Sequence, residues 1–189
     1  MSATKLAPWK VLEDKPVIAR RWLEVREQRI ALPQGGSIDA FHLIKTPDWG
    51  AALAVTYAAE VVMVRQYRHG YGSVSTELPA GVIDQGESPL AAVQRELREE
   101  TGYGAADWQP LLSVQTEPAR HTTRAHFFLA RGARRVAEAK LDAGEHIETL
   151  LVPAPELMAM LERGEIVHAV HVAAILTAVS RGLLSTTSP

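Results

Sequence analysis

The feature that most constrains this chain is the acidic stretch at residues 81–103, GVIDQGESPLAAVQRELREETGY. Five of the 22 acidic residues of the chain fall between Asp84 and Glu100. Carboxylates this close together raise one another's pKa unless a divalent cation or an arginine neutralises them, so the density points to a cation site. The alternative is a solvated helix face held by salt bridges, which is the usual meaning of a run of charges.

Local signals predict a helix at Pro89–Thr101 within this stretch. Ser88 is a preferred N-cap residue, a proline directly after it suits the first helical position, and Gly102 marks the C-terminal stop. At about 100° per residue, the helix carries an apolar stripe, and Glu96 and Glu100 lie about 40° apart at the edge of that stripe. The stripe consists of Leu90, Val93 and Leu97. Two carboxylates therefore share one wall of the helix.

The other charges on the predicted helix leave these two carboxylates free. Arg95 can pair with Glu99, four residues further along, so that Glu96 and Glu100 are free to bind a metal ion. Oxygen ligands favour a hard cation, Mg²⁺ first and Mn²⁺ second. The chain contains no cysteine, which excludes disulfides, thiolate zinc sites and a cysteine nucleophile.

The acidic stretch resembles the signature of the Nudix hydrolase family, G-x5-E-x7-R-E-U-x-E-E-x-G-U, in which U is an aliphatic residue. The matching positions are Gly81, Glu87, Arg95, Glu96, Leu97, Glu99, Glu100 and Gly102. Tyr103 departs from the signature, because an aliphatic residue is usual there. The resemblance implies a strand, a loop and a helix whose glutamates hold Mg²⁺ against a pyrophosphate. It implies that Glu96 and Glu100 are metal ligands and that Glu87 locks the loop to Arg95.

Length and composition fit one domain with a buried core. The chain has 189 residues, of which 47% are hydrophobic and 22% are charged, which is long enough for one core and short for two. A net charge of -2 without a block of lysine or arginine argues against nucleic acid as a partner. The N-terminus lacks the apolar segment of a signal peptide, and no stretch is apolar for long enough to span a membrane. We therefore expect a cytoplasmic protein.

Strands and a few helices follow one another without strict alternation, which predicts an α/β fold with a mixed sheet between helices. The expected strands are 51–57, 61–67, 111–115, 125–130 and 147–152, and the expected helices besides that of the acidic stretch are 155–164 and 168–181. Residues 17–44 suggest a β-hairpin with its turn at 33–36. The resemblance implies a Nudix-type α/β/α sandwich, and His168 and His171 read as structural residues of the last helix.

We divide the chain into an N-terminal β extension, residues 1–50, and a Nudix hydrolase domain, residues 51–184, within one structural domain overall. The hairpin of the extension has few partners in a minimal Nudix core. The resemblance implies that this extension mediates dimerisation, so we expect a homodimer.

Residues outside the signature resemble the branch of the family that hydrolyses ADP-ribose and other nucleoside diphosphate sugars. They are Tyr67 and Arg68, the ELPAG segment at 77–81, and Pro118, sixteen residues after Gly102. The branch usually has a glycine after that proline, where this chain has Ala119. The accessory motifs of the coenzyme A and diadenosine polyphosphate branches do not occur in this sequence.

The candidates for substrate binding are Arg68, Glu77, Trp22 and Trp49. Arg68 matches an arginine of the branch, and a guanidinium makes charge-assisted contacts to phosphate oxygens; a surface salt bridge is the alternative. Glu77 opens the segment that leads into the signature. In this branch the N-terminal strands often stack the nucleobase across a dimer interface, which favours Trp22 or Trp49. A single tryptophan more often packs in a core or an interface.

A carboxylate outside the helix is needed to position or deprotonate the attacking water, because Glu96, Glu99 and Glu100 lie on the metal side and a water in line with the scissile bond must be approached from the opposite side of the substrate. In the resembling branch an acidic residue lies just before or at the strand that starts at position 147. Glu145, in the loop 132–146 with Gly144 as its hinge, is preferred, and Glu148 is the alternative. Glu99 on the helix is a further catalytic candidate. A solvated loop carboxylate is the competing interpretation.

The resemblance and these residues together predict Mg²⁺-dependent hydrolysis of the pyrophosphate bond of a nucleoside diphosphate sugar such as ADP-ribose. The products are a nucleoside monophosphate and a sugar phosphate. Metal ions held by Glu96, Glu100 and the Ala80 carbonyl would neutralise the anhydride oxygens and activate a water. One alternative is a sanitising hydrolase of oxidised nucleoside triphosphates. Another is a sensor that binds a nucleotide sugar without turnover, although such modules tend to lose glutamates that this chain keeps.

Overall fold

The computed structural model describes residues 6–185, which form two compact units. Among the described residues, unit 1 comprises residues 6–47 and 115–123, and unit 2 comprises residues 48–114 and 124–185. The first five residues of the predicted extension lie outside the described residues. Residues 115–123 fall in the predicted hydrolase domain, yet they belong to unit 1. The backbone of Ile44 donates to the carbonyl of Arg120 (2.8 Å) and accepts from the N–H of Thr122 (3.1 Å).

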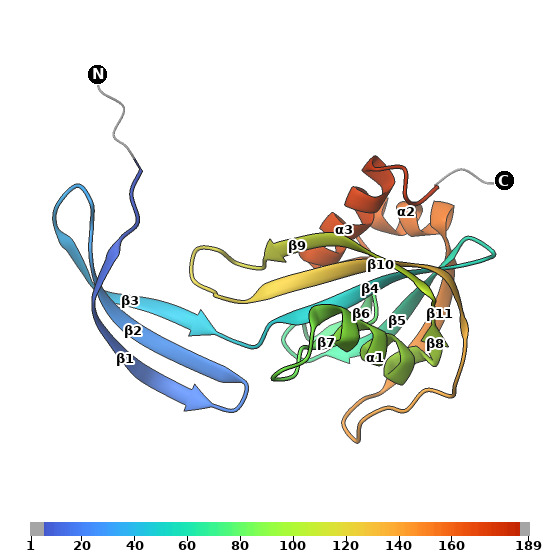
Figure 1. Cartoon of the computed structure of the whole chain (residues 1–189), viewed down its shortest axis with the longest axis horizontal. Coiled ribbons are helices and arrows are strands. Elements are labelled where there is room, and N and C mark those ends of the chain that lie inside the picture. Colours follow the sequence, from blue (N-terminus) through green and yellow to red (C-terminus); the bar gives the residue numbers. More distant parts are fainter. Residues whose placement is uncertain (1–5, 186–189) are drawn as a thin grey trace. The chain divides into compact units, whose positions relative to one another are not determined.

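Within its described residues, unit 1 is an antiparallel sheet of three strands in the order β1, β2, β3 (Figure 1). The strands are β1 (Lys10–Arg20), β2 (Leu23–Ala31) and β3 (Ser37–Lys45). The predicted hairpin corresponds to β2 and β3. Gly35 and Gly36 in its turn both have positive φ angles, which glycine adopts without strain.

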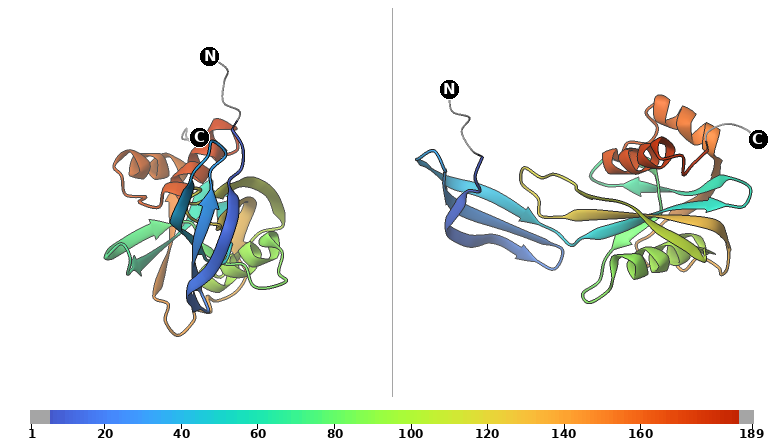
Figure 2. Two further views of the ribbon diagram at one scale, coloured as in Figure 1. Left: turned by 90° about the vertical axis from the view of Figure 1, so that its left-hand side faces the viewer. Right: turned by 45° about the horizontal axis from the view of Figure 1, so that its top comes forward.

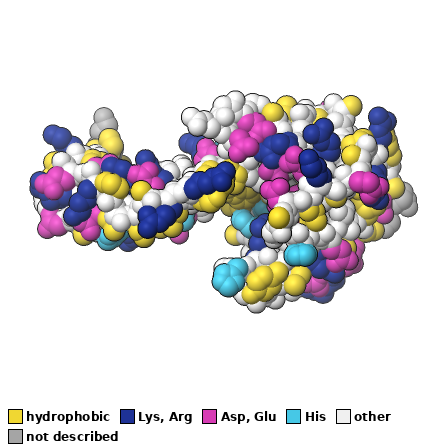
Figure 3. All heavy atoms as spheres, turned by 90° about the horizontal axis from the view of Figure 1, so that it is seen from below, with side chains coloured by type: hydrophobic (Ala, Val, Ile, Leu, Met, Phe, Trp, Pro, Cys, Tyr) yellow, Lys and Arg dark blue, Asp and Glu magenta, His cyan; other side chains and the backbone are white. Residues whose placement is uncertain are grey.

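Strand β1 corrects the prediction of a hairpin alone. Its sequence, KVLEDKPVIAR, is exposed along its whole length, so it lacks the alternation that marks a half-buried strand. Ion pairs to β2 accompany its backbone ladder, and they join Lys15 to Glu27 (2.7 Å), Asp14 to Arg26 (2.7 Å) and Glu13 to Arg29 (2.5 Å). In Figure 3, acidic, basic and apolar side chains are interspersed over this unit.

Unit 2 contains a mixed sheet, as predicted, with the strand order β11, β5, β4, β10, β8; β6 pairs with β5, β7 with β4 and β9 with β10. The strands are β4 (Trp49–Thr56), β5 (Glu60–Arg68), β6 (Ser73–Glu77), β7 (Ala80–Val82), β8 (Tyr103–Gly104), β9 (Asp107–Gln115), β10 (Arg124–Arg135) and β11 (Ile147–Pro153). β4 and β10 are parallel, whereas β5 is antiparallel to β4, β6 and β11. The short strands β6 and β8 have no counterpart among the predicted strands, because five and two residues are too few for a period to emerge, whereas β7 corresponds to the strand that the resemblance implies before the loop.

Helices cover both faces of the sheet of unit 2, in agreement with the predicted sandwich (Figure 2). α1 (Pro89–Thr101) packs Val93 and Leu97 against Val62 and the even-numbered alanines of β4. α2 (Ala154–Glu162) and α3 (Ala169–Ser180) contribute to the other core cluster, which includes Leu53 and Met63. Alternate residues of β4 and β5 therefore point to opposite helical layers. Among the described helices, none combines the length and the apolar character that crossing a membrane requires.

Helix α1 begins and ends where the sequence predicts. The hydroxyl of Ser88 accepts a hydrogen bond from the N–H of Ala91 (3.2 Å), and Pro89 lies in the first turn. Gly102 adopts a left-handed conformation (φ 74°), and its N–H donates to the carbonyl of Arg98 (2.9 Å). Both ends of the helix are set by local interactions, so its side chains occupy the predicted faces.

The segment between β6 and β7 crosses from one strand of the sheet to the next. Glu77 at the end of β6 pairs with Val64 of β5, and Ala80 at the start of β7 pairs with Ala51 of β4. Pro79 lies in the crossing, where its missing N–H removes no ladder hydrogen bond. The carbonyl of Pro79 accepts a hydrogen bond from the backbone N–H of Ala52 in β4 (2.9 Å). This crossing delivers the chain to the loop that precedes α1.

Candidate functional site

Two carboxyl groups of α1 lie against β7. Glu100 is buried, with 4% of its surface exposed, and its Oε2 accepts a hydrogen bond from the N–H of Ala80 (2.9 Å). Glu96 approaches the backbone of Gly81 so closely that a Cβ added there would lie 2.0 Å from its carboxyl carbon. A side chain at position 81 would therefore displace the Glu96 carboxyl from the place that it occupies. The two carboxyls share one wall, as the helix geometry predicts.

The surroundings of these carboxyls disfavour their charged forms. Burial raises the pKa of Glu100 to about 8; the charges of Glu96 and Glu145 add to this rise, while the Ala80 N–H and Arg68 oppose it. Burial also raises the pKa of Glu96, and Glu99 and Glu145 contribute in the same direction, against the opposing effect of Arg95. A divalent cation would relieve this repulsion, because it stabilises both carboxylates in their ionised form.

Arg95 lies at the centre of the remaining charges of α1. Its guanidinium donates to Glu87 (3.1 and 2.9 Å), to Glu99 (3.1 Å) and to the carbonyl of Val82 (3.1 Å). The predicted pairs of Arg95 with Glu87 and Glu99 are confirmed. The guanidinium also donates to Oε1 of Glu96 (2.7 Å), which corrects the expectation that Glu96 is free of Arg95. The guanidinium has five N–H donors, which are enough to bond Glu87, Glu96 and Glu99 at the same time.

The donor set fits a hard divalent cation, because it offers the carboxylate oxygens of Glu96 and Glu100 beside the backbone of Ala80. Among the described residues, however, no three His, Asp or Glu side chains already converge as a metal site. Arg95 donates to one oxygen of Glu96, and the Ala80 N–H donates to one oxygen of Glu100. A bound cation would use the remaining oxygens of these two side chains.

Arg68 and Glu77 form a second charged element beside the carboxyl wall. The Arg68 Nε lies 3.0 and 3.2 Å from the two Glu77 carboxylate oxygens, and its Nη2 donates to one of them (2.6 Å). Glu77 is 2% exposed; burial acts to raise its pKa, but Arg68 holds that pKa below the usual value. Within the described part of the chain, Nη1 of Arg68 forms no hydrogen bond. The Arg68 side chain is 43% exposed, so this nitrogen is available to an anion.

The two candidate carboxylates outside α1 have different surroundings. Glu145 accepts a hydrogen bond from the N–H of Asp142 (3.0 Å) in its own loop, and its charge raises the pKa of both Glu96 and Glu100. Glu148 instead forms an ion pair with Arg65 (3.4 Å). Of the two, Glu145 has an electrostatic connection to the carboxyl wall.

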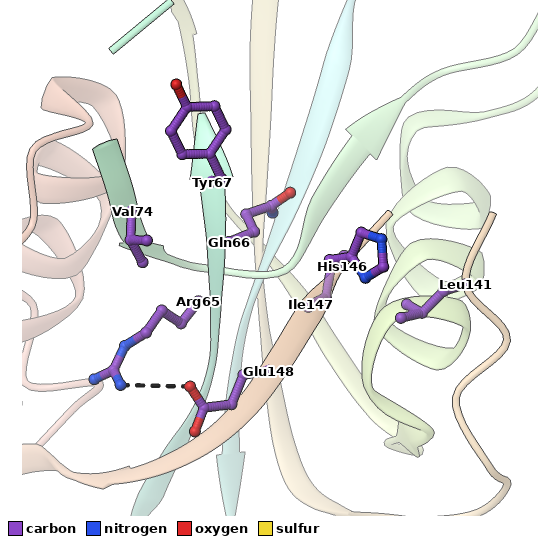
Figure 4. A pocket seen from close by; sticks show the side chains of 8 residues that line it. All are labelled: Arg65, Gln66, Tyr67, Val74, Leu141, His146, Ile147 and Glu148. Carbon is purple, nitrogen blue, oxygen red and sulfur yellow. Dashed lines mark hydrogen bonds and ion pairs between the residues drawn. The ribbon is translucent and has the colours of Figure 1, made fainter. Parts of the chain in front are cut away.

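A pocket of about 440 Å³ opens at the edge of the sheet formed by β6, β5 and β11 (Figure 4). It is lined by Arg65, Gln66, Tyr67, Val74, Leu141, His146, Ile147 and Glu148. Since side chains alternate along β5, Arg65 and Tyr67 point away from the layer in which Val62 contacts α1. Arg65 and its strand partner Glu148 therefore lie on the opposite side of the sheet from Glu96 and Glu100, whereas Gln66 and its partner Ile147 point to the same side as α1.

The two predicted tryptophans lie in different units. The ring of Trp49 packs edge-on against Phe127 (5.7 Å between centroids) and also contacts His168 (5.4 Å) and His171 (5.5 Å), on the side of the sheet that α3 covers. Trp22 is in unit 1, in the turn after β1, with 51% of its surface exposed and the Arg21 guanidinium 4.4 Å from its ring centroid. Trp22 has an open face, whereas the ring of Trp49 is engaged with other rings.

One polar contact beside the site has no signal in the sequence. His171 of α3 is 1% exposed, and its Nδ1 accepts a hydrogen bond from the N–H of Leu78 (3.1 Å), the residue that follows Glu77. The interpretation of His171 as structural leaves out this bond. The two residues are 93 positions apart, so no local pattern reveals it.

Comparisons with known proteins agree with this geometry. Residues 47–174 match the model of the NUDIX domain. An ADP-ribose pyrophosphatase from Mycobacterium tuberculosis is 35% identical over 154 residues, which cover 80% of this chain and 74% of that protein. A methanol dehydrogenase activator from Bacillus methanolicus is 28% identical over 163 residues, which cover 86% of this chain and 88% of that protein. The crystal structure of an ADP compounds hydrolase has the same fold, with a TM-score of 0.83 at 21% identity, over 96% of this chain and 100% of the other.

Proposed function

Because the chain belongs to the Nudix family, we propose that it hydrolyses the pyrophosphate bond of nucleoside diphosphate sugars such as ADP-ribose. The products are a nucleoside monophosphate and a sugar phosphate. The main support is the carboxyl wall of Glu96 and Glu100, whose raised pKa values call for a cation, beside Arg68, whose Nη1 forms no hydrogen bond to any described residue. A pyrophosphate neutralised by a cation on one side and a guanidinium on the other matches this arrangement.

Glu96, Glu100 and the Ala80 carbonyl are the residues that we propose to hold Mg²⁺, with Mn²⁺ as a substitute. Bound there, the cation would neutralise the anhydride oxygens and lower the pKa of a coordinated water. The family and the oxygen-only donor set support this choice. Before the cation binds, the proton held by Glu100 must leave, since its pKa is about 8 without metal.

Arg68 would bind a phosphate oxygen of the substrate through Nη1, while Glu77 holds the guanidinium in place through the other two nitrogens. Arg68 then forms both a salt bridge and a phosphate contact, because the salt bridge to Glu77 orients the guanidinium towards the phosphate. Glu77 is then a substrate-site residue that acts through Arg68. For the nucleobase, Trp22 is the exposed stacking candidate, and Trp49, whose ring packs against Phe127, is the alternative.

Glu145 is our choice for the group that takes a proton from the attacking water. The water oxygen forms a bond to phosphorus as the bridging P–O bond breaks, and the bridging oxygen leaves with the other phosphate. The influence of Glu145 on the pKa of Glu96 and Glu100 supports its proximity to the reaction. Glu148 is the alternative, although its ion pair with Arg65 argues for a role elsewhere, and Glu99 is held by Arg95 on α1.

We also propose that the protein acts in the cytoplasm as a homodimer and that its partners are small nucleotides rather than nucleic acid or a membrane. The dimer would form through unit 1, in which apolar side chains are exposed on β1 and β2. These side chains are Val11, Leu12, Val17, Ile18 and Leu23. Their burial against a second copy would remove apolar surface from water.

The direct test is a substrate panel. Purified protein with Mg²⁺ is incubated with ADP-ribose, GDP-mannose, ADP-glucose, UDP-glucose and 8-oxo-dGTP, and the products are identified by chromatography. Nucleoside monophosphate released from the diphosphate sugars supports the proposal. Pyrophosphate released from the oxidised triphosphate alone would instead establish the sanitising reaction, and tight binding without any product would establish a sensor.

A further inference from the structure

The backbone N–H of Leu78 lies at a point where the sheet offers it no strand partner. The residue before it, Glu77, still pairs with β5, and Ala80, two residues later, pairs with β4. Leu78 itself is fully buried, with 0% of its surface exposed, so water cannot satisfy its N–H. A buried N–H without an acceptor is strongly disfavoured, and the acceptor here is the imidazole Nδ1 of His171 at 3.1 Å.

This hydrogen bond defines the state of the imidazole. Because Nδ1 accepts, the neutral ring carries its proton on Nε2. The ring lies parallel to that of His168, with 4.2 Å between centroids and an interplanar angle of 14°, and meets Phe127 edge-on. Burial, together with His168, lowers the pKa of His171 to about 3, although Glu77 acts against this shift. The ring is therefore neutral under ordinary conditions and accepts continuously.

The histidine at position 171 brings a buried donor without a described partner into the core, which indicates that its acceptor nitrogen is needed. Within the described residues, Nε2 of His171 is buried and has no hydrogen-bond partner. A leucine would fill the same space in this apolar cluster without the unpaired Nε2 donor, but it would leave the buried N–H of Leu78 without an acceptor. The one interaction that imidazole supplies and leucine lacks is the bond to Leu78.

The segment held by this bond carries both charged elements of the site. Upstream of Leu78, Glu77 orients Arg68 through both of its carboxylate oxygens. Downstream, the N–H of Ala80 donates to Glu100 (2.9 Å). A shift of the crossing at Leu78 would therefore move the guanidinium and the buried carboxyl relative to each other.

We propose that His171 is a positioning residue of the hydrolytic site, which holds the β6–β7 crossing in register through the N–H of Leu78 so that Arg68 and Glu100 keep their relative geometry. This inference rests on the proposed function for its effect on turnover, but the hydrogen bond itself is independent of any substrate. A displacement of reacting groups by about 1 Å can lower the rate by about 10²-fold.

The test compares two substitutions at position 171 with one at its neighbour. In His171→Asn, the side-chain oxygen takes the place of Nδ1 as acceptor, whereas His171→Leu removes the acceptor and keeps an apolar side chain. His168→Leu is the matched control, because it removes the stacked ring and leaves the bond to Leu78 intact. Each variant is assayed for kcat and KM with ADP-ribose and Mg²⁺, and for the exchange of the Leu78 amide by NMR.

We expect kcat of His171→Leu to fall by about 10- to 100-fold with a smaller change in KM, together with faster exchange of the Leu78 amide. His171→Asn should recover most of both properties, and His168→Leu should resemble the wild type. A His171→Asn variant as slow as His171→Leu would overturn the proposal, and so would full kcat in His171→Leu.

A second measurement keeps the inference testable if His171→Leu does not fold. The ¹⁵N spectrum of the wild-type imidazole reports which nitrogen carries the proton, and a proton on Nδ1 would overturn the proposal, whereas a proton on Nε2 supports it. The outcomes also separate the two claims. A wild-type protein that cleaves no nucleotide sugar would overturn the proposed function, whereas an active wild type with an equally active His171→Leu variant would overturn only the role of His171.

Discussion

Glu96, Glu99 and Glu100 are close neighbours on α1, yet their surroundings make them different acids. Glu100 is buried against Ala80, and Glu96 is wedged against Gly81 and bonded to Arg95. The side chain of Glu99 is 38% exposed and pairs only with Arg95 among its described neighbours. Glu100 is thus a buried carboxyl with a high proton affinity, Glu96 is a carboxyl whose charge is partly neutralised by Arg95, and Glu99 belongs to a surface ion pair.

Replacing Glu100 by glutamine should lower kcat by about 10²- to 10³-fold while the protein still folds. The amide oxygen can still accept from the Ala80 N–H, but the charge that a cation needs is lost. Steady-state kinetics at saturating Mg²⁺ and a thermal melt measure both effects. Turnover near that of the wild type would contradict the assignment of Glu100 as a metal ligand.

The pKa of Glu100 predicts how metal-free protein responds to pH. Its pKa in the folded state is about 8, against 4.5 for an ordinary glutamate, so the folded state binds the proton more tightly than the unfolded state does. The stabilisation is complete below about pH 4.5 and is lost as the pH rises towards 8. In EDTA, the Tm of the wild type should therefore fall over this range by more than that of Glu100→Gln.

Mg²⁺ should reverse this loss at the alkaline end of the range, because the ionised carboxylate then has a partner. Thermal melts with and without Mg²⁺ across the pH series test both statements. Equal pH dependence of Tm in the wild type and in Glu100→Gln would mean that Glu100 is not the group that titrates.

The two loop and strand carboxylates make a matched pair for mutation. Glu145→Gln should lower kcat on the order of 10²-fold with little change in KM, since a general base acts mainly in the transition state. Glu148→Gln should keep near-normal turnover, because its partner is Arg65 in the pocket of Figure 4. Full activity in both variants would place the base elsewhere in the chain.

At the scale of elements, the fit between α1 and β7 is tight enough that one methyl group matters. The chain passes from β6 through the crossing into β7, so that Gly81 faces the carboxyl of Glu96. The loop and helix that follow are secured by Arg95, which joins Glu87 to the α1 glutamates. The site is therefore a contact between two elements, and its precision depends on their separation.

Gly81→Ala should lower kcat by about 10-fold or more with little change in Tm. The added Cβ would meet the carboxyl carbon of Glu96 at 2.0 Å, and the flexible end of that side chain would move away instead of the backbone. The control is Gly70→Ala, where a Cβ has nothing within 4 Å and no positive φ is required. Steady-state kinetics and thermal melts of both variants test this prediction. An unchanged kcat in Gly81→Ala would show that turnover does not depend on the position of Glu96.

At the scale of the whole molecule, unit 1 and unit 2 differ in how much of their apolar surface is buried in a core. Unit 2 encloses both core clusters between helices and a mixed sheet. Unit 1 exposes β1 along its whole length and is crossed by ion pairs between neighbouring strands. A sheet with so little internal core gains most from covering its apolar side chains with another surface.

Val17→Asp should shift a homodimer towards the monomer, because Val17 is 54% exposed on β1 and a buried carboxylate there would lose its hydration. Val136→Asp is the control, since Val136 is similarly exposed (52%) but lies in unit 2. Sedimentation at micromolar concentration measures the effect. A wild-type protein that is monomeric and fully active under these conditions would contradict the dimer.

The sequence by itself determined the helix at the centre of the site and the chemistry that the helix offers. The bounds of α1, its Ser88 cap, its Gly102 stop and the shared wall of Glu96 and Glu100 are all local properties, because neighbours within four residues set them. The mixed sheet between helical layers also followed from the pattern of strands and helices, and the signature predicted the family.

The tertiary structure decided what depends on residues far apart in the chain. Burial raises the pKa of Glu100, the crossing from β6 to β7 puts Gly81 against Glu96, and the loop before β11 separates the environment of Glu145 from that of Glu148. β1 became a strand through pairing with β2, without a pattern of its own. The bond from Leu78 to His171 joins residues 93 positions apart, and only the packing of α3 against the sheet creates it.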